Sequence, residues 1–285
     1  MLVWLDERAC HEVTRVGGKA ANLSRLASAY RVPPGFCLTT EAYAAWAVGH
    51  EGGTMPEAAQ RLVRTAYATL GARCQVAAPR VAVRSSAVGE DSQSASFAGQ
   101  YATYLNMVGA EAVLEAIGRC WDSARAERVR LYHHHRGQAA TPLAVLVQQL
   151  VPADRALVAF SAHPVTNNHA EVVINASWGL GESVVSGTVT PDTYVVRKAD
   201  LCVIDRQIAD KQRMTVLAPD GVQEVPIPRP MRCQPALSEA QASEVAQLAR
   251  GLEAYMGWPV DIECAYQGET LYLLQCRPIS TLQPE

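Results

Sequence analysis

The fold of this chain is decided by the stretch from Val260 to Ile279, which reads V-D-I-E-C-A-Y-Q-G-E-T-L-Y-L-L-Q-C-R-P-I. Apolar and polar residues alternate on both sides of Gln267-Gly268-Glu269. An alternation of period two predicts β-strands, and a short polar segment with a glycine between them predicts a hairpin. We therefore expect two antiparallel strands joined by a three-residue loop.

The register of this hairpin decides which side chains share a face. A three-residue loop pairs Glu263 with Leu273 and Asp261 with Gln275, and it places Asp261, Glu263, Gln275 and Arg277 on one surface. A two-residue loop would place the acidic residues and the other two on opposite faces, because a slip of one residue reverses every side chain.

The four side chains of this surface suggest a phosphate site. Magnesium prefers hard oxygen ligands, often one or two carboxylates together with phosphates of a substrate. Arginine binds phosphate oxygens through two parallel hydrogen bonds. The alternative is an amphipathic hairpin whose polar face only meets solvent, which is common in antiparallel sheets. The hairpin by itself leaves both interpretations open.

Length and composition indicate a soluble globular protein. The chain has 285 residues, enough for one large domain or two lobes, and a formal net charge of -3. The mixed charge gives no electrostatic reason to expect nucleic acid or a membrane surface as a partner. The eight cysteines are scattered without C-x-x-C spacing, and the N-terminus lacks a basic signal-peptide region. We therefore expect a cytoplasmic protein without a disulfide framework or a zinc site.

A glycine pair near the N-terminus precedes a helical pattern. Val16-Gly17-Gly18-Lys19 leads into apolar residues at helical spacing, so we expect a helix to start close to Gly18. Backbone N–H groups at such a helix start can bind phosphate, and Lys19 adds a positive charge. The spacing is not that of a Walker A loop. A glycine turn with a solvated lysine is the alternative.

Arg84 follows the buried strand candidate Val81 to Val83 and precedes a loop rich in serine and glycine. An arginine at a strand end is a plausible phosphate clamp. It could equally form a structural ion pair with Glu90 or Asp91.

Several helices are expected from the apolar spacing. One runs from about Glu57 to Arg73, and another from Glu111 to about His135. The second ends in three consecutive histidines, which point about 100° apart on a helix and cannot converge on one metal ion. A last helix begins at a capping box, Ser238 with Gln241, and ends at Gly257. For the first helix, the inward-facing residues are expected to be Leu62, Ala66, Thr69 and Leu70.

The order of the motifs and the residues in them resemble one protein family over almost the whole chain. It is the N-terminal nucleotide-binding domain of phosphoenolpyruvate synthase, pyruvate phosphate dikinase and rifampin phosphotransferase. The matching phrases are V-G-G-K-A-A-N-L at Val16, V-P-P-G-F at Val32, V-R-S-S-A at Val83, A-S-F-A-G-Q at Ala95, V-Q-Q-L-V-P at Val147, W-G-L-G-E-S-V-V-S-G at Trp178 and D-I-E followed by L-Q-C-R-P-I from Asp261.

The resemblance implies a mixed α/β, ATP-grasp-like fold of two lobes with ATP between them. We expect an N-terminal lobe over residues 1–140 and a C-terminal lobe over residues 141–285. It also implies the role of individual residues. The implied phosphate ligands are Lys19, Arg84 and Arg277, the magnesium ligands are Glu263 and Gln275 with Asp261 close by, and the adenine hinge is Gln149, Leu150 and Val151.

The sequence departs from the family in two places. Family members commonly carry Asp or Asn where this chain has His163, in Phe160-Ser161-Ala162-His163-Pro164. His163 is either a phosphoryl acceptor or a tolerated loop residue. Family enzymes also continue beyond the segment that ends here at Arg277-Pro278-Ile279 into a carrier domain with a phosphorylatable histidine.

The resemblance implies an ATP-dependent, magnesium-dependent phosphotransferase of the dikinase type. It would cleave ATP to AMP and phosphate and phosphorylate a histidine on a separate carrier protein or domain, ahead of a small-molecule acceptor. Two other functions stay open. One is a self-sufficient kinase or ligase acting on a small molecule, and the other is a non-catalytic ATP-binding sensor.

Overall fold

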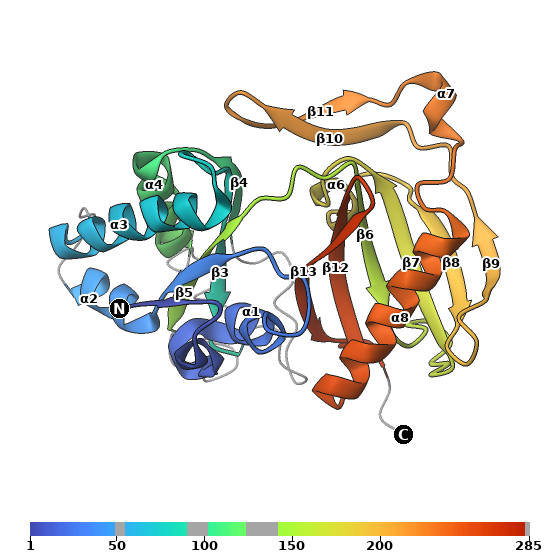
Figure 1. Cartoon of the computed structure of the whole chain (residues 1–285), viewed down its shortest axis with the longest axis horizontal. Coiled ribbons are helices and arrows are strands. Elements are labelled where there is room, and N and C mark those ends of the chain that lie inside the picture. Colours follow the sequence, from blue (N-terminus) through green and yellow to red (C-terminus); the bar gives the residue numbers. More distant parts are fainter. Residues whose placement is uncertain (49–54, 90–101, 124–141, 283–285) are drawn as a thin grey trace. The chain divides into compact units, whose positions relative to one another are not determined.

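The computed structural model describes residues 1–48, 55–89, 102–123 and 142–282, and the chain divides into two compact units, Met1–Leu150 and Val151–Glu285. Each unit contains a β-sheet and helices (Figure 1). The division lies later in the chain than the expected boundary at residue 140. The reason is strand β5 (Leu143–Gln149), which pairs with strands of the first unit.

The first unit is built on a five-stranded antiparallel sheet of order β1-β2-β5-β3-β4. Its strands besides β5 are β1 (Leu2–Trp4), β2 (Gly35–Leu38), β3 (Val81–Ala87) and β4 (Thr103–Met107). Its helical elements are η1 (Arg8–His11), α1 (Val13–Leu26), α2 (Thr40–Val48), α3 (Glu57–Cys74) and α4 (Ala110–Ser123).

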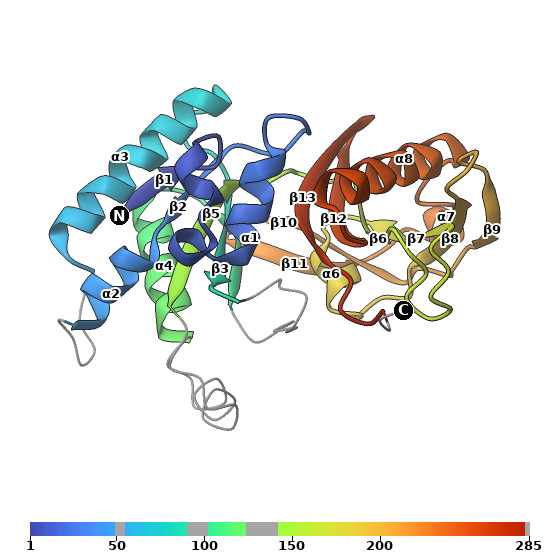
Figure 2. The ribbon, with the colours of Figure 1, turned by 90° about the horizontal axis from the view of Figure 1, so that it is seen from below.

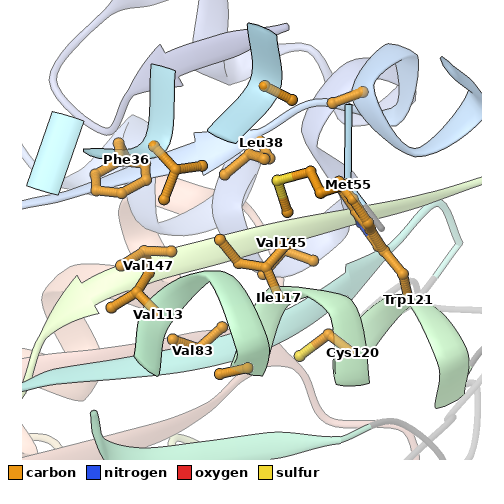
Figure 3. Packing of buried hydrophobic residues seen from close by; sticks show 14 of the residues in the cluster. Phe36, Leu38, Met55, Val83, Val113, Ile117, Cys120, Trp121, Val145 and Val147 are labelled. Carbon is orange, nitrogen blue, oxygen red and sulfur yellow. The ribbon is translucent and has the colours of Figure 1, made fainter. Parts of the chain in front are cut away.

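Helices α2, α3 and α4 bury one face of this sheet. Alternate residues of the strands, such as Phe36, Val83 and Val145, pack with Ile117 and Trp121 of α4 in one apolar cluster (Figure 3). All five of these side chains are fully buried. The alternation that predicted the strands therefore also supplies the core, because every second residue points to the same face.

Helix α1 packs on strands β3 and β5, and its kink at Gly17 gives the predicted helix start. Gly17 has a φ of +75°, and the helix continues regularly from Gly18. Ser86 of β3 fixes this point, because its Oγ accepts a hydrogen bond of 3.2 Å from the Ala20 N–H.

The second unit is built on a six-stranded antiparallel sheet of order β13-β12-β6-β7-β8-β9. The strands are β6 (Arg155–Phe160), β7 (Glu171–Trp178), β8 (Asp192–Arg197), β9 (Val203–Gln207), β12 (Val260–Gln267) and β13 (Thr270–Pro278). A separate hairpin of β10 (Arg213–Ala218) and β11 (Gly221–Pro226) and the short helices α6 (Glu182–Val185) and α7 (Arg229–Arg232) complete the unit with the long helix α8 (Glu239–Met256).

Helix α8 lies across one face of this sheet (Figure 2). Its capping box is confirmed: Ser238 Oγ accepts from the Gln241 N–H and the Gln241 side chain accepts from the Ser238 N–H. Tyr266 anchors the helix from β12, since its hydroxyl donates to Glu244 Oε2 at 2.7 Å. The helix ends at Gly257, as predicted.

The predicted register of the last hairpin is wrong, but the four polar side chains still share one face as predicted. The turn is formed by two residues, Gly268-Glu269, because Gln267 pairs with Thr270. A β-bulge after Glu263 then restores the alignment, so that Glu263 faces Gln275 and Asp261 faces Arg277. Leu274 is the additional residue of the bulged strand. The four side chains of the expected surface therefore share one face: Asp261, Glu263, Gln275 and Arg277.

The inward-facing residues predicted for α3 need correction, and two other predictions concern residues outside the described part of the chain. The predicted inward residues Leu62 and Thr69 are wrong, and Leu62 is 45 % exposed. The buried positions of α3 are Ala59, Val63, Ala66, Tyr67, Leu70 and Gly71. Helix α4 is described as far as Ser123. The expectations for His133 to His135 and for Glu90 or Asp91 as partners of Arg84 fall outside the described residues.

Among the described helices, none is long and apolar enough to cross a membrane.

Candidate functional site

The centre of the candidate site is the pair of facing residues at the end of hairpin β12–β13. Arg277 Nε donates a hydrogen bond of 2.8 Å to Asp261 Oδ2. The Asp261 side chain is largely buried, while the Arg277 side chain is 26 % exposed. The ion pair therefore holds an arginine in a fixed position with part of its surface open to a ligand.

The ion pair with Arg277 does not fully offset the effect of burial on the Asp261 carboxyl, whose pKa is raised. Burial is the largest effect and raises the pKa of the Asp261 carboxyl, Arg277 lowers it, and the negative charge of Glu263 raises it again. Its second oxygen, Oδ1, is buried and has no hydrogen-bond partner among the described residues. A buried carboxylate oxygen without a partner is unfavourable, so a cation or a donor from a ligand would stabilise it.

Glu263 and Gln275 face each other one step further along the same hairpin. Gln275 is buried and Glu263 is partly buried. Directly opposite residues of an antiparallel pair have Cβ atoms about 5 Å apart, which brings the carboxylate and the amide together. The same row continues across the sheet, since Glu263 faces Val158, Val158 faces Asn175 and Asn175 faces Thr193.

A pocket of about 520 Å³ lies within the second unit, and its lining includes four residues of this row: Glu263, Val158, Asn175 and Thr193. Glu263 and Arg277 line one part of it. Asn175, Thr193 and Gln207, which are neutral and polar, line the other. The sheet face that carries this row is the one opposite α8, because the neighbouring Tyr194 and Tyr266 bond to α8 and the segment before it.

The side chains present fit a magnesium ion. No group of three or more His, Cys, Asp or Glu side chains suited to a metal occurs in the part of the chain that the structure describes. Magnesium does not need such a group, because it is usually held by one or two carboxylates and completes its shell with water and substrate phosphates. Asp261 and Glu263 supply two carboxylates, and Gln275 supplies an amide oxygen. The unpartnered Asp261 Oδ1 is the observation that supports this fit.

In the first unit, Lys19 and Arg84 are brought to the same face of the sheet. Arg84 and Ser86 are two residues apart on β3 and share a face, and Ser86 contacts α1 at Ala20. Lys19 immediately precedes Ala20 on that helix. The expected phosphate residues of this unit are thus carried by two elements that pack on one another.

The segment expected to hold adenine lies where the chain passes from one unit to the next. Gln149 ends β5 and its N–H donates to the Pro34 carbonyl oxygen. The Leu150 N–H donates to the Arg80 carbonyl oxygen. Both backbone groups are thereby fixed to neighbouring strands and loops of the first unit, whereas Val151 is the first residue of the second.

His163 has a structural explanation. Its Nδ1 accepts hydrogen bonds from the N–H groups of Val165, at 3.3 Å, and Thr166, at 3.4 Å. Aspartate and asparagine commonly make such bonds to backbone groups two residues ahead. His163 Nδ1 therefore makes the backbone contacts in this turn that Asp or Asn would make.

The sequence did not reveal the neutral part of the pocket or the buried ion pair of Asp192 and Lys211 behind it. Asn175 and Thr193 belong to strands β7 and β8, and no sequence motif distinguishes them. Lysine is almost never fully buried, so nothing in the sequence pattern marks Lys211.

Comparison with known proteins assigns the family. The model of the pyruvate phosphate dikinase AMP/ATP-binding domain matches residues 50–285. The chain belongs to this family. The resemblance stated from the sequence motifs is confirmed.

Relatives of this dikinase-family chain align over nearly its whole length. A probable phosphoenolpyruvate synthase of Methanocaldococcus jannaschii is 37 % identical over 99 % of the chain and 27 % of the relative. The phosphoenolpyruvate synthase of Pyrococcus furiosus is 34 % identical over 99 % of the chain and 44 % of the relative. A rifampicin phosphotransferase of Streptomyces sviceus is 38 % identical over 96 % of the chain and 35 % of the relative. The chain thus spans less than half the length of these relatives.

Among solved structures, D-alanyl-alanine synthetase A of Vibrio cholerae covers 94 % of this chain and 60 % of its own, with 13 % identity and a TM-score of 0.39. That TM-score is below the level at which a fold can be assigned.

Proposed function

We propose that this chain is the nucleotide-binding part of a dikinase-type phosphotransferase, which binds ATP with magnesium and transfers a phosphoryl group to a histidine of a separate carrier domain or protein. The observation that carries this proposal is that one face of hairpin β12–β13 bears Asp261, Glu263, Gln275 and Arg277. Two of these residues, Glu263 and Arg277, line the pocket. Membership of an AMP/ATP-binding domain family supports it.

The proposed roles follow from the chemistry of each side chain. Glu263 and Gln275 hold magnesium through oxygen atoms, with Asp261 beside them. Arg277, oriented by its bond to Asp261, contacts the terminal phosphates. The metal, when bound, neutralises charge on the phosphate oxygens and so favours attack at phosphorus.

The first unit contributes to the same nucleotide in this proposal. Lys19 and Arg84 bind phosphate oxygens. Lys19 follows the kink of α1 at Gly17, where the helix resumes and backbone N–H groups favour anions. Gln149 to Val151 bind the adenine ring through the backbone. Fixed positive groups around a phosphate chain lower the barrier mainly by electrostatic stabilisation, with no reorganisation needed during the reaction.

The overall reaction proposed is that of phosphoenolpyruvate synthases. A histidine nitrogen forms a bond to the β-phosphorus while the P–O bond to AMP breaks, and its electron pair leaves with AMP. Water then forms a bond to the terminal phosphorus, the P–O bond between the two transferred phosphoryl groups breaks, and inorganic phosphate is released. AMP, inorganic phosphate and phosphohistidine are the products, and the carrier then delivers the phosphoryl group to a small molecule.

Nucleotide product analysis tests the proposal. The chain is incubated with magnesium and ATP, alone and with candidate carrier proteins. AMP together with phosphate only when a carrier is present supports the proposal. ADP, or AMP without any carrier, would instead support a self-sufficient kinase or ligase, and tight binding without turnover would support a sensor.

Variants of the last hairpin make this test specific to the site. Glu263→Ala should weaken magnesium-dependent ATP binding at least about tenfold, corresponding to a loss of about 1.4 kcal/mol. Glu269→Ala removes a carboxylate from the turn of the same hairpin, where the side chain is 83 % exposed, and should leave binding unchanged. Equal effects of the two variants would contradict the assignment of Glu263.

A further inference from the structure

The second unit contains an ion pair that is completely buried. Lys211 Nζ lies 2.5 Å from Asp192 Oδ1, and both side chains have 0 % exposure. Removing two charges from water is so unfavourable that a buried ion pair is weak evidence for stability as such. The pair therefore calls for another structural purpose.

The pair binds both polar backbone groups of one residue, Ala209. The Ala209 N–H donates to Asp192 Oδ1 at 2.9 Å, and the Ala209 carbonyl oxygen accepts from Lys211 Nζ at 3.2 Å. Asp192 Oδ2 accepts a further bond of 2.7 Å from the Ala236 N–H, next to the start of α8. The segment that follows β9 is thus tied to the sheet and to the base of α8 at once.

Ala209 belongs to the wall of the pocket. Ile208 and Ala209 line it, and so does Thr193, the residue after Asp192 on β8. Adjacent strand residues point to opposite faces of a sheet. The Asp192 side chain therefore lies on the face of the sheet opposite the pocket, while Thr193 forms part of the pocket floor. The ion pair of Asp192 and Lys211 fixes the distance between this floor and the wall formed by Ile208 and Ala209.

The part of the pocket that this wall encloses is chemically different from the magnesium and phosphate part. Its uncharged polar lining residues are Asn175, Thr190, Thr193 and Gln207. Thr193 Oγ1 donates to Asn175 Oδ1 at 3.0 Å. Among the described lining residues, the charged ones are Glu263 and Arg277. Neutral amides and hydroxyls are poor ligands for a second polyphosphate but suit an uncharged hydrogen-bonding group, such as a neutral imidazole that must keep its lone pair to attack phosphorus.

We propose that Asp192 and Lys211 are positioning residues that hold the Ile208–Ala209 wall against the part of the pocket that receives the phosphoryl acceptor. This inference rests on the proposed function, because it takes Glu263 and Arg277 as the end of the pocket that binds the phosphates of ATP. Loosening the wall then impairs phosphoryl transfer and leaves the binding of magnesium and ATP intact.

The experiment compares three variants in the full chain. Lys211→Met leaves the Asp192 carboxylate buried without a counter-charge. The double variant Asp192→Asn with Lys211→Met removes that charge but still leaves the Ala209 carbonyl oxygen without its donor. Lys198→Met is the control, because Lys198 forms a partly buried ion pair with Glu253 in the same unit and does not line the pocket.

Two quantities are measured for each variant: the Kd of ATP with magnesium, and the rate of AMP formation with a carrier that supports the wild type. In Lys211→Met and in the double variant the rate should fall at least about tenfold, since small displacements of positioning groups can cost that much. The Kd should stay within about threefold of wild type, below the tenfold that corresponds to 1.4 kcal/mol. The double variant should regain melting temperature without regaining rate, so it keeps the test valid if Lys211→Met does not fold.

The outcomes separate the inference from the proposed function. Rates in the double variant equal to those in Lys198→Met would overturn the inference alone, provided that the wild type forms AMP and Glu263→Ala does not. A rise in the Kd by the same factor as the loss of rate would overturn it as well, because the wall would then serve the nucleotide. Failure of the wild type to form AMP with every carrier would overturn the proposed function and the inference together.

Discussion

Gly17 is a residue at which the backbone admits no side chain. Its φ is +75°, and a Cβ atom there would lie 2.2 Å from the Ser86 carbonyl oxygen. Gly17→Ala should therefore destabilise the protein by at least about 2 kcal/mol, since both the backbone conformation and the space oppose it. Urea denaturation measures this change.

Gly118 provides the matched control. It lies in α4, has an ordinary φ, and a Cβ atom there would meet nothing within 4 Å. Gly118→Ala should raise the free energy of unfolding by up to about 1 kcal/mol, because alanine has the higher helix propensity. Similar losses in both variants would mean that Gly17 is not held against β3 as described.

Asp261 should make stability depend on pH in an unusual direction. Burial raises the pKa of its carboxyl in the folded protein above the ordinary value. The folded state then binds this proton more tightly than the unfolded chain, so the stability attributable to Asp261 increases as the pH falls and is lowest when the carboxylate is ionised. Without magnesium, the stability of wild type relative to Asp261→Asn should therefore increase on acidification.

Paired denaturation curves of wild type and Asp261→Asn over a series of pH values check this sign. Comparison with the variant cancels the contribution of the other carboxyl groups. A relative stability that decreases on acidification would show that the bond to Arg277 outweighs burial and that the pKa is lowered instead.

At the scale of single elements, helix α8 depends on its first turn. The Ser238 hydroxyl accepts a hydrogen bond from the Gln241 N–H at 3.2 Å, and helix N–H groups at this position have no partner within the helix. Ser238→Ala should lower the free energy of unfolding by about 1 kcal/mol. Ser238→Thr keeps the oxygen and should cost less than about 0.5 kcal/mol.

Thermal or urea denaturation of both variants tests the cap. Because α8 covers one face of the sheet, the loss should appear as a shift of the denaturation midpoint with an unchanged slope. Equal midpoints for the alanine and threonine variants would mean that the capping hydrogen bond adds nothing to stability.

The elements also show which structural features a sequence can reveal. The capping box of α8 could be predicted from the sequence, because Ser238 and Gln241 stand three residues apart and form their hydrogen bonds with each other. The register of hairpin β12–β13 was not predictable, because a bulge at Leu274 shifts the alternation of β13 between the two faces by one residue. The order of apolar and polar residues in the sequence does not mark this shift. In α3, the apolar spacing allows either Leu62 or Val63 to face the core. The structure buries Val63, in an apolar cluster that also contains residues of α4.

The candidate site was predictable to a similar degree. Glu263 and Gln275 stand on the two strands of one hairpin, so the sequence could predict that they share a face, and the observed pairing confirms this. The wall of the pocket depends on contacts between Asp192, Lys211 and Ala236, which stand far apart along the chain. No local pattern records such contacts, and the burial of a lysine contradicts its usual preference for the surface.

At the scale of the whole molecule, the proposed function requires that one nucleotide use residues from both units. Lys19 and Arg84 belong to Met1–Leu150, and Glu263 and Arg277 belong to Val151–Glu285. Titration calorimetry of the full chain with ATP and magnesium should give one site per chain. Lys19→Met and Glu263→Ala should each weaken that same site at least about tenfold, which corresponds to 1.4 kcal/mol.

The double variant decides whether the two residues act on one ligand. If Lys19 and Glu263 bind the same phosphate chain, loss of either lets the phosphates shift, so the second substitution should cost less in the double variant than alone. Two independent sites predict instead that Lys19→Met leaves a site of wild-type affinity that Glu263→Ala then removes. A stoichiometry of two in the wild type, or full affinity in Lys19→Met, would therefore separate the units functionally and restrict the ATP site to the pocket of the second unit.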